Sequence, residues 1–197
     1  MSPARSSGPS RPEPSLPEKV VSIHEALGSK KIPHAIGGAL ALAYYAEPRA
    51  TIDIDLNVFV PTTSYPLVIG ALSPLGVKVD DLNQADLERD GQCRLWWGDN
   101  PVDLFFAYDE IHEEMRKEAR KVPFADTSLP ILAPEHLAIC KAMFDRPKDW
   151  IDIEQMLVAT DDLDVVEIVR QLNRMVGPEN PRLQRLDELK SKLAIEG

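Results

Sequence analysis

The stretch Ile52-Asp53-Ile54-Asp55-Leu56-Asn57-Val58-Phe59-Val60 alternates apolar and polar side chains along most of its length. Because successive side chains point to opposite faces of a β-strand, this pattern predicts a strand with Asp53, Asp55 and Asn57 on one face. The two carboxylates then lie side by side, with their backbones roughly 6–7 Å apart. Such a pair can hold two divalent cations, although an edge strand with an exposed polar face would show the same alternation.

Two glycines precede this strand. Gly37-Gly38 follows a short apolar piece at 34–36 and comes before an alanine-rich stretch at 39–45 that is typical of a buried helix. The pair therefore predicts a strand-to-helix junction where a phosphate can approach bare backbone N–H groups, although any tight turn uses the same residues. Arg49, just before the strand, is a candidate phosphate ligand or an ion-pair partner for an aspartate.

The rest of the sequence predicts more strands and then a run of helices. The segments 93–97 and 102–107 flank a turn cluster at 98–101 and predict an antiparallel pair. Short strands are expected near 122–124 and 129–132. The predicted helices are 18–31, 64–72, 109–121, 135–144, 149–159, 164–176 and 181–194.

These elements predict an α+β fold, in which a mixed sheet flanked by helices is followed by a C-terminal helical bundle. The expected α/β domain covers 19–130 and the helical domain covers 131–197. Residues 1–18 are rich in proline and serine and hold little that could enter a core, so we expect a disordered leader there.

Composition limits the function. The chain has 197 residues and a formal net charge of −10, which argues against a protein that coats nucleic acid through a broad basic surface. Its two cysteines, Cys93 and Cys140, form neither a disulfide framework nor a zinc-binding pattern. No apolar run approaches the roughly 18–20 residues of a membrane span. These features predict a cytoplasmic protein without a membrane association.

Two more charged residues lie among apolar neighbours. Asp103 sits between valine and leucine in the second strand of the predicted pair, where a carboxylate is unfavourable without a partner. It is a candidate third metal ligand or, alternatively, a side chain on the solvent face. Lys141 lies on a predicted helix, and its apolar neighbours Ile139, Cys140, Ala142 and Met143 weaken the interpretation of an ordinary solvated lysine.

Two blocks carry a family resemblance. The first joins Ile36-Gly37-Gly38-Ala39-Leu40-Ala41-Leu42 to Thr51-Ile52-Asp53-Ile54-Asp55-Leu56. The second joins Leu132-Ala133-Pro134-Glu135-His136-Leu137-Ala138-Ile139-Cys140-Lys141-Ala142-Met143 to Asp145-Arg146-Pro147-Lys148-Asp149-Trp150-Ile151-Asp152-Ile153. Together they resemble the DNA polymerase β-type nucleotidyltransferases, specifically the AbiEii/MenT group of toxin nucleotidyltransferases. The toxin group has Gly-Gly where other members commonly have Gly-Ser, which argues against a polymerase or an aminoglycoside-modifying enzyme.

The resemblance implies a role for each matching residue. The implied metal ligands are Asp53, Asp55 and, less directly, Asp103. The implied nucleotide-binding residues are Gly37, Gly38 and Lys141, to which Arg49 is added on the grounds given above. The implied catalytic residues are Asp53, Asp55, Lys141 and Asp152. Asp149 belongs to the same acidic motif as Asp152, which would orient Lys141 or the acceptor hydroxyl, or would be an ordinary acid near a helix N-terminus.

The resemblance also implies an activity. It predicts a two-metal, Mg²⁺-dependent transferase that adds nucleotides from an NTP, in particular CTP, to the 3′ end of tRNA. Blocked aminoacylation would then stop translation, and a cognate antitoxin protein would be the partner. Basic residues at 116–121 and 170–192 would grip the RNA, or would form solvated helix faces. The alternatives are a nucleotidyltransferase that modifies a protein or a small molecule, and a non-catalytic protein that binds nucleotide or a partner.

Overall fold

The computed structural model describes residues 13–79, 87 and 89–193. Predictions for 1–12, for most of the irregular segment 77–90 and for residue 194 therefore lie outside the described residues. Helix α1 (Leu16–Ser29) begins inside the predicted leader. The Ser15 N–H and hydroxyl both donate to the Glu18 carboxylate at 2.7 Å, which satisfies a free donor at the helix start and orders the chain before residue 19.

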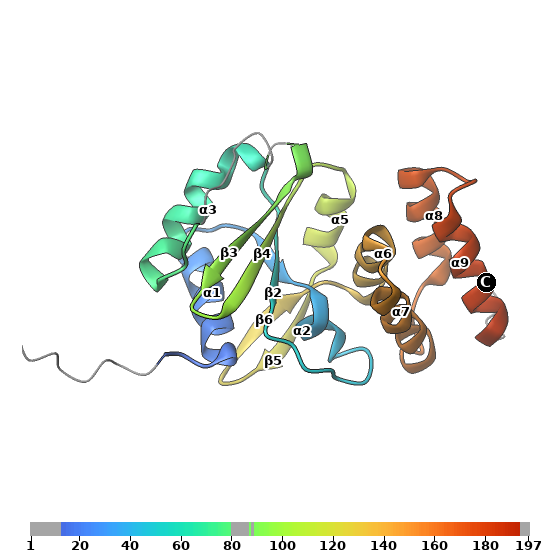
Figure 1. The fold of residues 1–197 in the computed structure, drawn as a ribbon, viewed down its shortest axis with the longest axis horizontal. Coiled ribbons are helices and arrows are strands. Elements are labelled where there is room, and N and C mark those ends of the chain that lie inside the picture. Colours follow the sequence, from blue (N-terminus) through green and yellow to red (C-terminus); the bar gives the residue numbers. More distant parts are fainter. Residues whose placement is uncertain (1–12, 80–86, 88, 194–197) are drawn as a thin grey trace, which may run out of the picture.

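One six-stranded mixed sheet forms the centre of the molecule, in the order β3-β4-β2-β1-β6-β5 (Figure 1). Strand β2 runs parallel to β4 and antiparallel to β1, and β1 runs parallel to β6. The strands are β1 (His34–Ile36), β2 (Ile54–Val58), β3 (Gln92–Trp97), β4 (Asn100–Phe106), β5 (Arg120–Phe124) and β6 (Thr127–Ile131). The predicted α+β class is thereby confirmed.

Strand β2 lies inside the sheet, between β4 and β1. Ile54, Leu56 and Val58 are fully buried on one face, as the alternation predicts. The strand is shorter than the predicted 52–60, because ladder pairing with β4 starts at Ile54 and Ile52 is 62% exposed. Its interior position excludes the edge-strand alternative, so the polar face of β2 needs another explanation.

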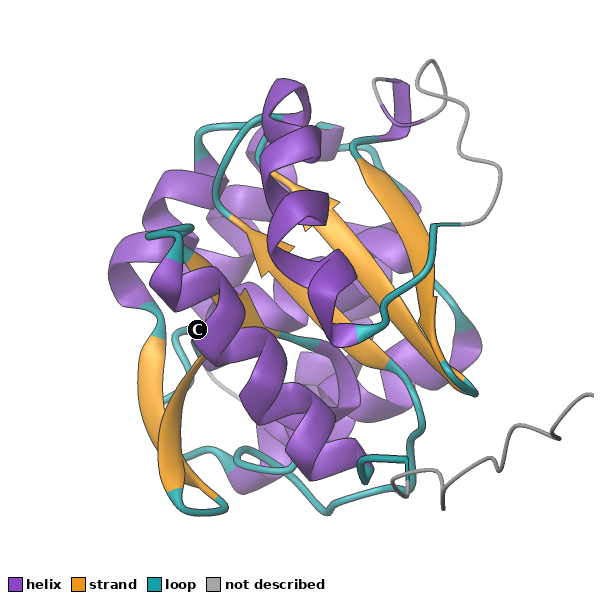
Figure 2. Ribbon diagram, turned by 90° about the vertical axis from the view of Figure 1, so that its left-hand side faces the viewer, coloured by secondary structure: helices purple, strands orange, loops and turns teal. Residues whose placement is uncertain are grey.

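Helices cover both faces of the sheet. Figure 1 shows α1 and α3 on one side and α6 to α9 on the other, and Figure 2 shows helices in front of the strands and behind them. Helix α2 begins at the second glycine of the pair and ends at Leu42, so it is shorter than the predicted helix 39–45. The remaining helices are α2 (Gly38–Leu42), α3 (Tyr65–Leu72), α5 (Ile111–Glu118), α6 (Pro134–Phe144), α7 (Pro147–Ala159), α8 (Val165–Val176) and α9 (Pro181–Leu193).

The four C-terminal helices begin after the sheet ends at Ile131, and their bounds agree with the predicted ranges to within two residues. Between α6 and α7 the chain reverses at Asp145, whose φ of 57° is left-handed. This turn sets α7 against α6, so that side chains from both helices face the sheet together. Throughout the described residues, no helix combines the length and the apolar character needed to cross a bilayer.

Candidate active site

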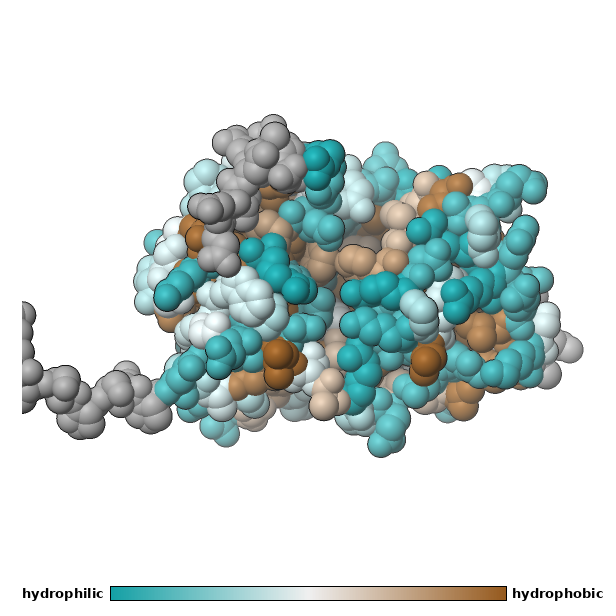
Figure 3. All heavy atoms as spheres, in the orientation of Figure 1, coloured by the Kyte–Doolittle hydropathy of each residue, from teal (hydrophilic) through white to brown (hydrophobic). Residues whose placement is uncertain are grey.

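A cavity of about 590 Å³ opens between the sheet and the C-terminal helices. The space-filling view shows the hollow between the two parts of the molecule (Figure 3). Strands β2, β3 and β4 supply one wall, and α5, α6 and the start of α7 supply the other. The polar face of β2 therefore does not meet solvent broadly, but faces an enclosed space of the size of a small-molecule site.

The glycine pair makes room for two side chains of β2. Gly38 has a φ of +56°, and a Cβ at this position would overlap the carboxylate of Asp55. A Cβ on Gly37 would lie 2.8 Å from Nδ2 of Asn57. The Gly37 N–H also donates to the Asp55 carbonyl oxygen at 2.9 Å, which fixes the junction against the strand. Both glycines are therefore required because the side chains of Asn57 and Asp55 lie too close for a Cβ, a constraint that a simple turn does not impose.

Three carboxylates project from the sheet into the cavity. Asp55 on β2 and Asp103 on β4 are direct register partners, and Asp53 lies just before β2 on the same face. Burial first, and then the neighbouring charges of Asp103 and Asp53, raise the pKa of Asp55 to about 6. Within the described chain, the side chains of Asp53 and Asp55 make no hydrogen bond or ion pair.

Asp103 differs from the other two carboxylates, because Arg94 holds it. The guanidinium of Arg94, on β3, donates to both carboxylate oxygens of Asp103 at 2.7 Å. Over residues 13–79, 87 and 89–193, no three His, Cys, Asp or Glu side chains are arranged to hold a metal ion. Each Asp103 oxygen accepts one hydrogen bond from Arg94 and keeps a further lone pair that faces the cavity.

The donor set nevertheless fits a hard divalent cation such as Mg²⁺. Such cations prefer carboxylate oxygens, and two uncompensated carboxylates on one face repel each other until a cation neutralises them. Asp53 and Asp55 are in this position, and Asp103 lies beside Asp55 in the sheet. These residues would hold the metal ions that the family resemblance implies.

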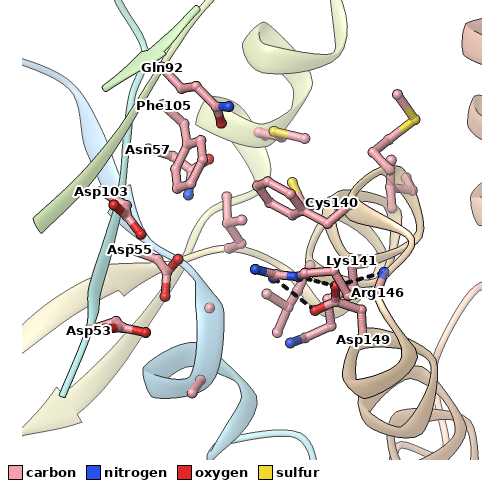
Figure 4. Close-up of a pocket in the computed structure, with 18 of the residues that line it drawn as sticks. Asp53, Asp55, Asn57, Gln92, Asp103, Phe105, Cys140, Lys141, Arg146 and Asp149 are labelled. Carbon is pink, nitrogen blue, oxygen red and sulfur yellow. Dashed lines mark hydrogen bonds and ion pairs between the residues drawn. The ribbon is translucent and has the colours of Figure 1, made fainter. Parts of the chain in front are cut away.

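The opposite wall of the cavity is cationic. Figure 4 shows Lys141, Arg146 and Asp149 grouped on the helices, across from the three aspartates on the strands. The Arg146 guanidinium donates to Asp149 at 2.6 and 3.0 Å and stacks over the Phe144 ring, 4.7 Å from its centroid. Asp149 thus holds the Arg146 side chain in place. The same helix start also places Lys148 at the cavity.

Lys141 is held by a buried ion pair. Its Nζ atom donates to Oδ2 of Asp152 at 2.6 Å, and both side chains are almost fully buried. Arg49 donates to the two oxygens of the same carboxylate at 3.2 Å. Burial alone would raise the pKa of Asp152, but the hydrogen bonds from Lys141 and Arg49 outweigh it and hold that pKa below its ordinary value.

Most of the residues predicted for the site line one cavity. Gly38, Arg49, Asp53, Asp55, Asp103, Lys141 and Asp149 do so. Gly37 and Asp152 do not line it. Gly37 leaves room for the side chain of Asn57, and Asp152 lies behind Lys141. In this structure Asp152 has the geometry of a residue that positions Lys141.

Several lining residues received no role in the sequence analysis. They are Asn57, Gln92, Arg94, Phe105, Phe144, Arg146 and Lys148. The alternation of β3 and β4 could have placed Arg94 and Phe105 on the same face as Asp103. The side chains of Phe144 and Arg146 carry no local signal, because their position depends on the turn between α6 and α7.

Comparison with protein-family models and with curated proteins finds no match for this sequence. Solved structures do match. The solution structure of the antibiotic-resistance factor ANT(2″)-Ia superposes with a TM-score of 0.58 at 18% identity, over 91% of this chain and 97% of that chain. The lincosamide antibiotic adenylyltransferase LnuA, bound to lincomycin, matches with a TM-score of 0.52 at 13% identity, over 72% of this chain and 96% of that chain. The chain therefore has the nucleotidyltransferase fold.

Proposed function

We propose that this protein is a Mg²⁺-dependent nucleotidyltransferase, which transfers a nucleotide from a nucleoside triphosphate to a hydroxyl group. The observation that carries this proposal is the opposition of Asp53 and Asp55 to Lys141 across one cavity. One wall offers unpaired carboxylates for metal ions, and the other offers buried cations for phosphates. Because Gly38 has no Cβ, its backbone lies directly against the carboxylate of Asp55 at one end of that cavity.

The proposed reaction is an in-line displacement at the α-phosphorus. A bond forms from the acceptor oxygen to the α-phosphorus while the hydroxyl proton passes to water. The bond from the α-phosphorus to the bridging oxygen breaks, and pyrophosphate leaves with that electron pair. Positioning and charge neutralisation dominate such a reaction. Asp53, Asp55 and Asp103 would hold Mg²⁺. The bound metal would neutralise negative charge on the phosphates and lower the pKa of the acceptor hydroxyl.

The chain's own cations would position the donor. Lys141 and Arg146 would bind the triphosphate oxygens, and Asp152 would keep the Lys141 ammonium aimed at the cavity. Since Lys141 is 4% exposed, its rotamer freedom is already lost before substrate binds. The buried ion pair therefore supports a preorganised phosphate contact.

For the acceptor we propose the 3′ end of tRNA, with CTP as the donor, in a toxin that an antitoxin protein neutralises. Support comes from the order and spacing of the two sequence blocks, and from Gly37-Gly38 in place of Gly-Ser. A chain with a net charge of −10 must bind RNA through a local patch, so its affinity should fall steeply with salt.

A small-molecule hydroxyl is the second candidate acceptor, and one observation favours it. The arginines predicted to grip RNA are paired with acids: Arg116 with Glu113, Arg170 with Glu167 and Arg174 with Asp109, each at 2.6 Å. Such pairs reduce the positive potential that a polyanion needs. The names of the two proteins described above, ANT(2″)-Ia and LnuA, connect them with antibiotics, which supports the same candidate.

The test is transfer of label from α-³²P NTPs, each supplied separately with Mg²⁺. Total tRNA, aminoglycosides and lincosamides serve as acceptors in separate reactions, and product masses identify the linkage. Label in tRNA supports the toxin, and label in an antibiotic supports the second candidate. The Asp53→Asn variant should lose all transfer. A folded wild-type protein that labels no acceptor contradicts the proposed enzyme and leaves the non-catalytic alternative.

A further inference from the structure

A second row of side chains crosses the sheet beside the carboxylates. Asn57 on β2 is the register partner of Phe105 on β4, and Phe105 is the partner of Gln92 on β3. All three side chains line the cavity, and Figure 4 shows them together above Asp55 and Asp103. Asn57 and Phe105 each lie two residues beyond a carboxylate on the same strand, so this row is roughly 6–7 Å from the carboxylates. The proposed transfer chemistry leaves the row without a role.

Asn57 has the features of an unfilled binding group. It is 5% exposed, yet its carboxamide makes no hydrogen bond to any described residue. Among the described residues, only Tyr65 Oη and His136 Nδ1 are fully buried side-chain atoms without a partner, so the carboxamide atoms of Asn57 keep access to the cavity. A ligand in the cavity can therefore supply the hydrogen bonds that the protein does not. The close approach of Gly37 leaves the amide room to sit at the cavity wall. The carboxamide of Gln92, at the exposed end of the row, likewise has no hydrogen-bond partner in the described chain.

Aromatic rings complete the row. Phe105 and Phe144 meet at 5.6 Å between ring centroids and 70° between ring planes, so the sheet and α6 form an aromatic corner. A flat ring in this corner would stack on one phenyl group and meet the other at its edge. Its own edge would then lie within reach of the two carboxamides, each of which offers a donor and an acceptor.

We propose that Asn57, Phe105 and Gln92 form a nucleobase subsite that selects the base of a nucleotide in this active site. A nucleobase is the ligand that combines a stacking face with an edge of paired donors and acceptors. The spacing of the two rows is one that a ribose bridges, with the phosphate at Asp55 and the base at Asn57. The inference rests on the proposed nucleotidyl transfer, and the base belongs to either the donor triphosphate or the acceptor.

Calorimetric titration of purified protein distinguishes these two sources. In one arm, ATP, CTP, GTP and UTP are titrated separately with Mg²⁺ and without acceptor. In the other arm, the RNA trinucleotides CCA, CCC, CCG and CCU are titrated without donor. We expect the wild type to prefer one base by about 10-fold or more in one arm, because a bidentate base contact discriminates by that order.

The variants Asn57→Leu and Gln92→Leu should each reduce this preference, to less than about 3-fold for Asn57→Leu. The matched control is Asn173→Leu, an exposed asparagine on α8, which should keep the full preference. Gln92 is exposed, so its variant remains informative even where a change at buried Asn57 disturbs folding.

The arm in which the preference disappears identifies the source of the base. A preference that survives both substitutions, or a wild type that binds all bases equally in both arms, overturns the subsite but leaves label transfer intact. A wild type that binds no NTP and transfers no label overturns the proposed function together with the subsite. The two failures are therefore distinguishable.

Discussion

The backbone of Gly38 lies so close to the carboxylate of Asp55 that any Cβ at position 38 would overlap it. The contact joins the turn after β1 to the central strand β2. The positive φ of Gly38 is a second, independent reason why a residue with a side chain is unfavourable at this position. One glycine therefore serves both the fold and the site.

Gly38→Ala should remove activity and lower the free energy of unfolding by about 2–4 kcal/mol, because the methyl group displaces Asp55 and the backbone is strained. Gly70→Ala is the matched control, since a Cβ there meets nothing within 4 Å in a helix. That change should instead stabilise by roughly 0.5–1 kcal/mol. Urea unfolding and label transfer measure both. Equal stability of the two variants would contradict the close contact.

Asp55→Asn should inactivate the protein but stabilise it. Folding raises the pKa of Asp55 to about 6, so the folded state binds this proton more tightly than the unfolded chain. Wild-type stability from this group is therefore lost as the pH rises from about 4 to 6. In EDTA at pH 7.5 the variant should gain about 1–3 kcal/mol, and the gain should vanish near pH 4. If the variant is less stable than the wild type at pH 7.5, the conclusion that the Asp55 carboxylate has no stabilising partner is wrong.

Lys141 and Asp152 should show strong coupling in a double-mutant cycle. Asp152→Leu leaves a buried ammonium without its carboxylate and should cost about 3 kcal/mol of stability. Adding Lys141→Met should restore much of that loss, while neither protein regains activity. Asp152→Asn, which keeps a hydrogen-bond acceptor, should retain more kcat than Asp152→Leu. Additive stability effects would show that the two side chains do not interact.

Stability should fall as the solution is acidified below pH 6.5. Burial lowers the pKa of His34, His112 and His136 below the ordinary 6.5, so the unfolded chain takes up these protons first. Their contribution is complete above pH 6.5 and is lost as the pH falls toward the folded pKa values. Urea unfolding at pH 7.5 and 5.5 tests this in the Asp55→Asn background, where the opposing titration is absent. His136→Leu should reduce the difference in the free energy of unfolding between pH 7.5 and 5.5. An unchanged difference would contradict a contribution from His136.

Local patterns predicted most of the elements and half of the site, although the predicted helix 109–121 ends at Glu118 and its last two residues belong to strand β5. The alternation of 52–60 placed Asp53 and Asp55 on one face, because a side-chain period of two is a property of any strand. Gly37-Gly38 likewise marked the junction after β1, and the helical period beyond Pro134 predicted α6 to α9 within two residues. Each of these features depends on neighbours in the chain alone.

Long-range packing supplied the remainder, since periodicity says which face a residue takes but not which strands or helices become neighbours. Asp103 reaches Asp55 because β4 pairs in parallel with β2, and Arg94 reaches Asp103 because β3 pairs with β4. Asn57 is buried because β2 is flanked on both sides, although its sequence resembles that of an exposed strand. Burial and ion pairing arise between segments distant in the sequence, and their energies exist only after those segments meet.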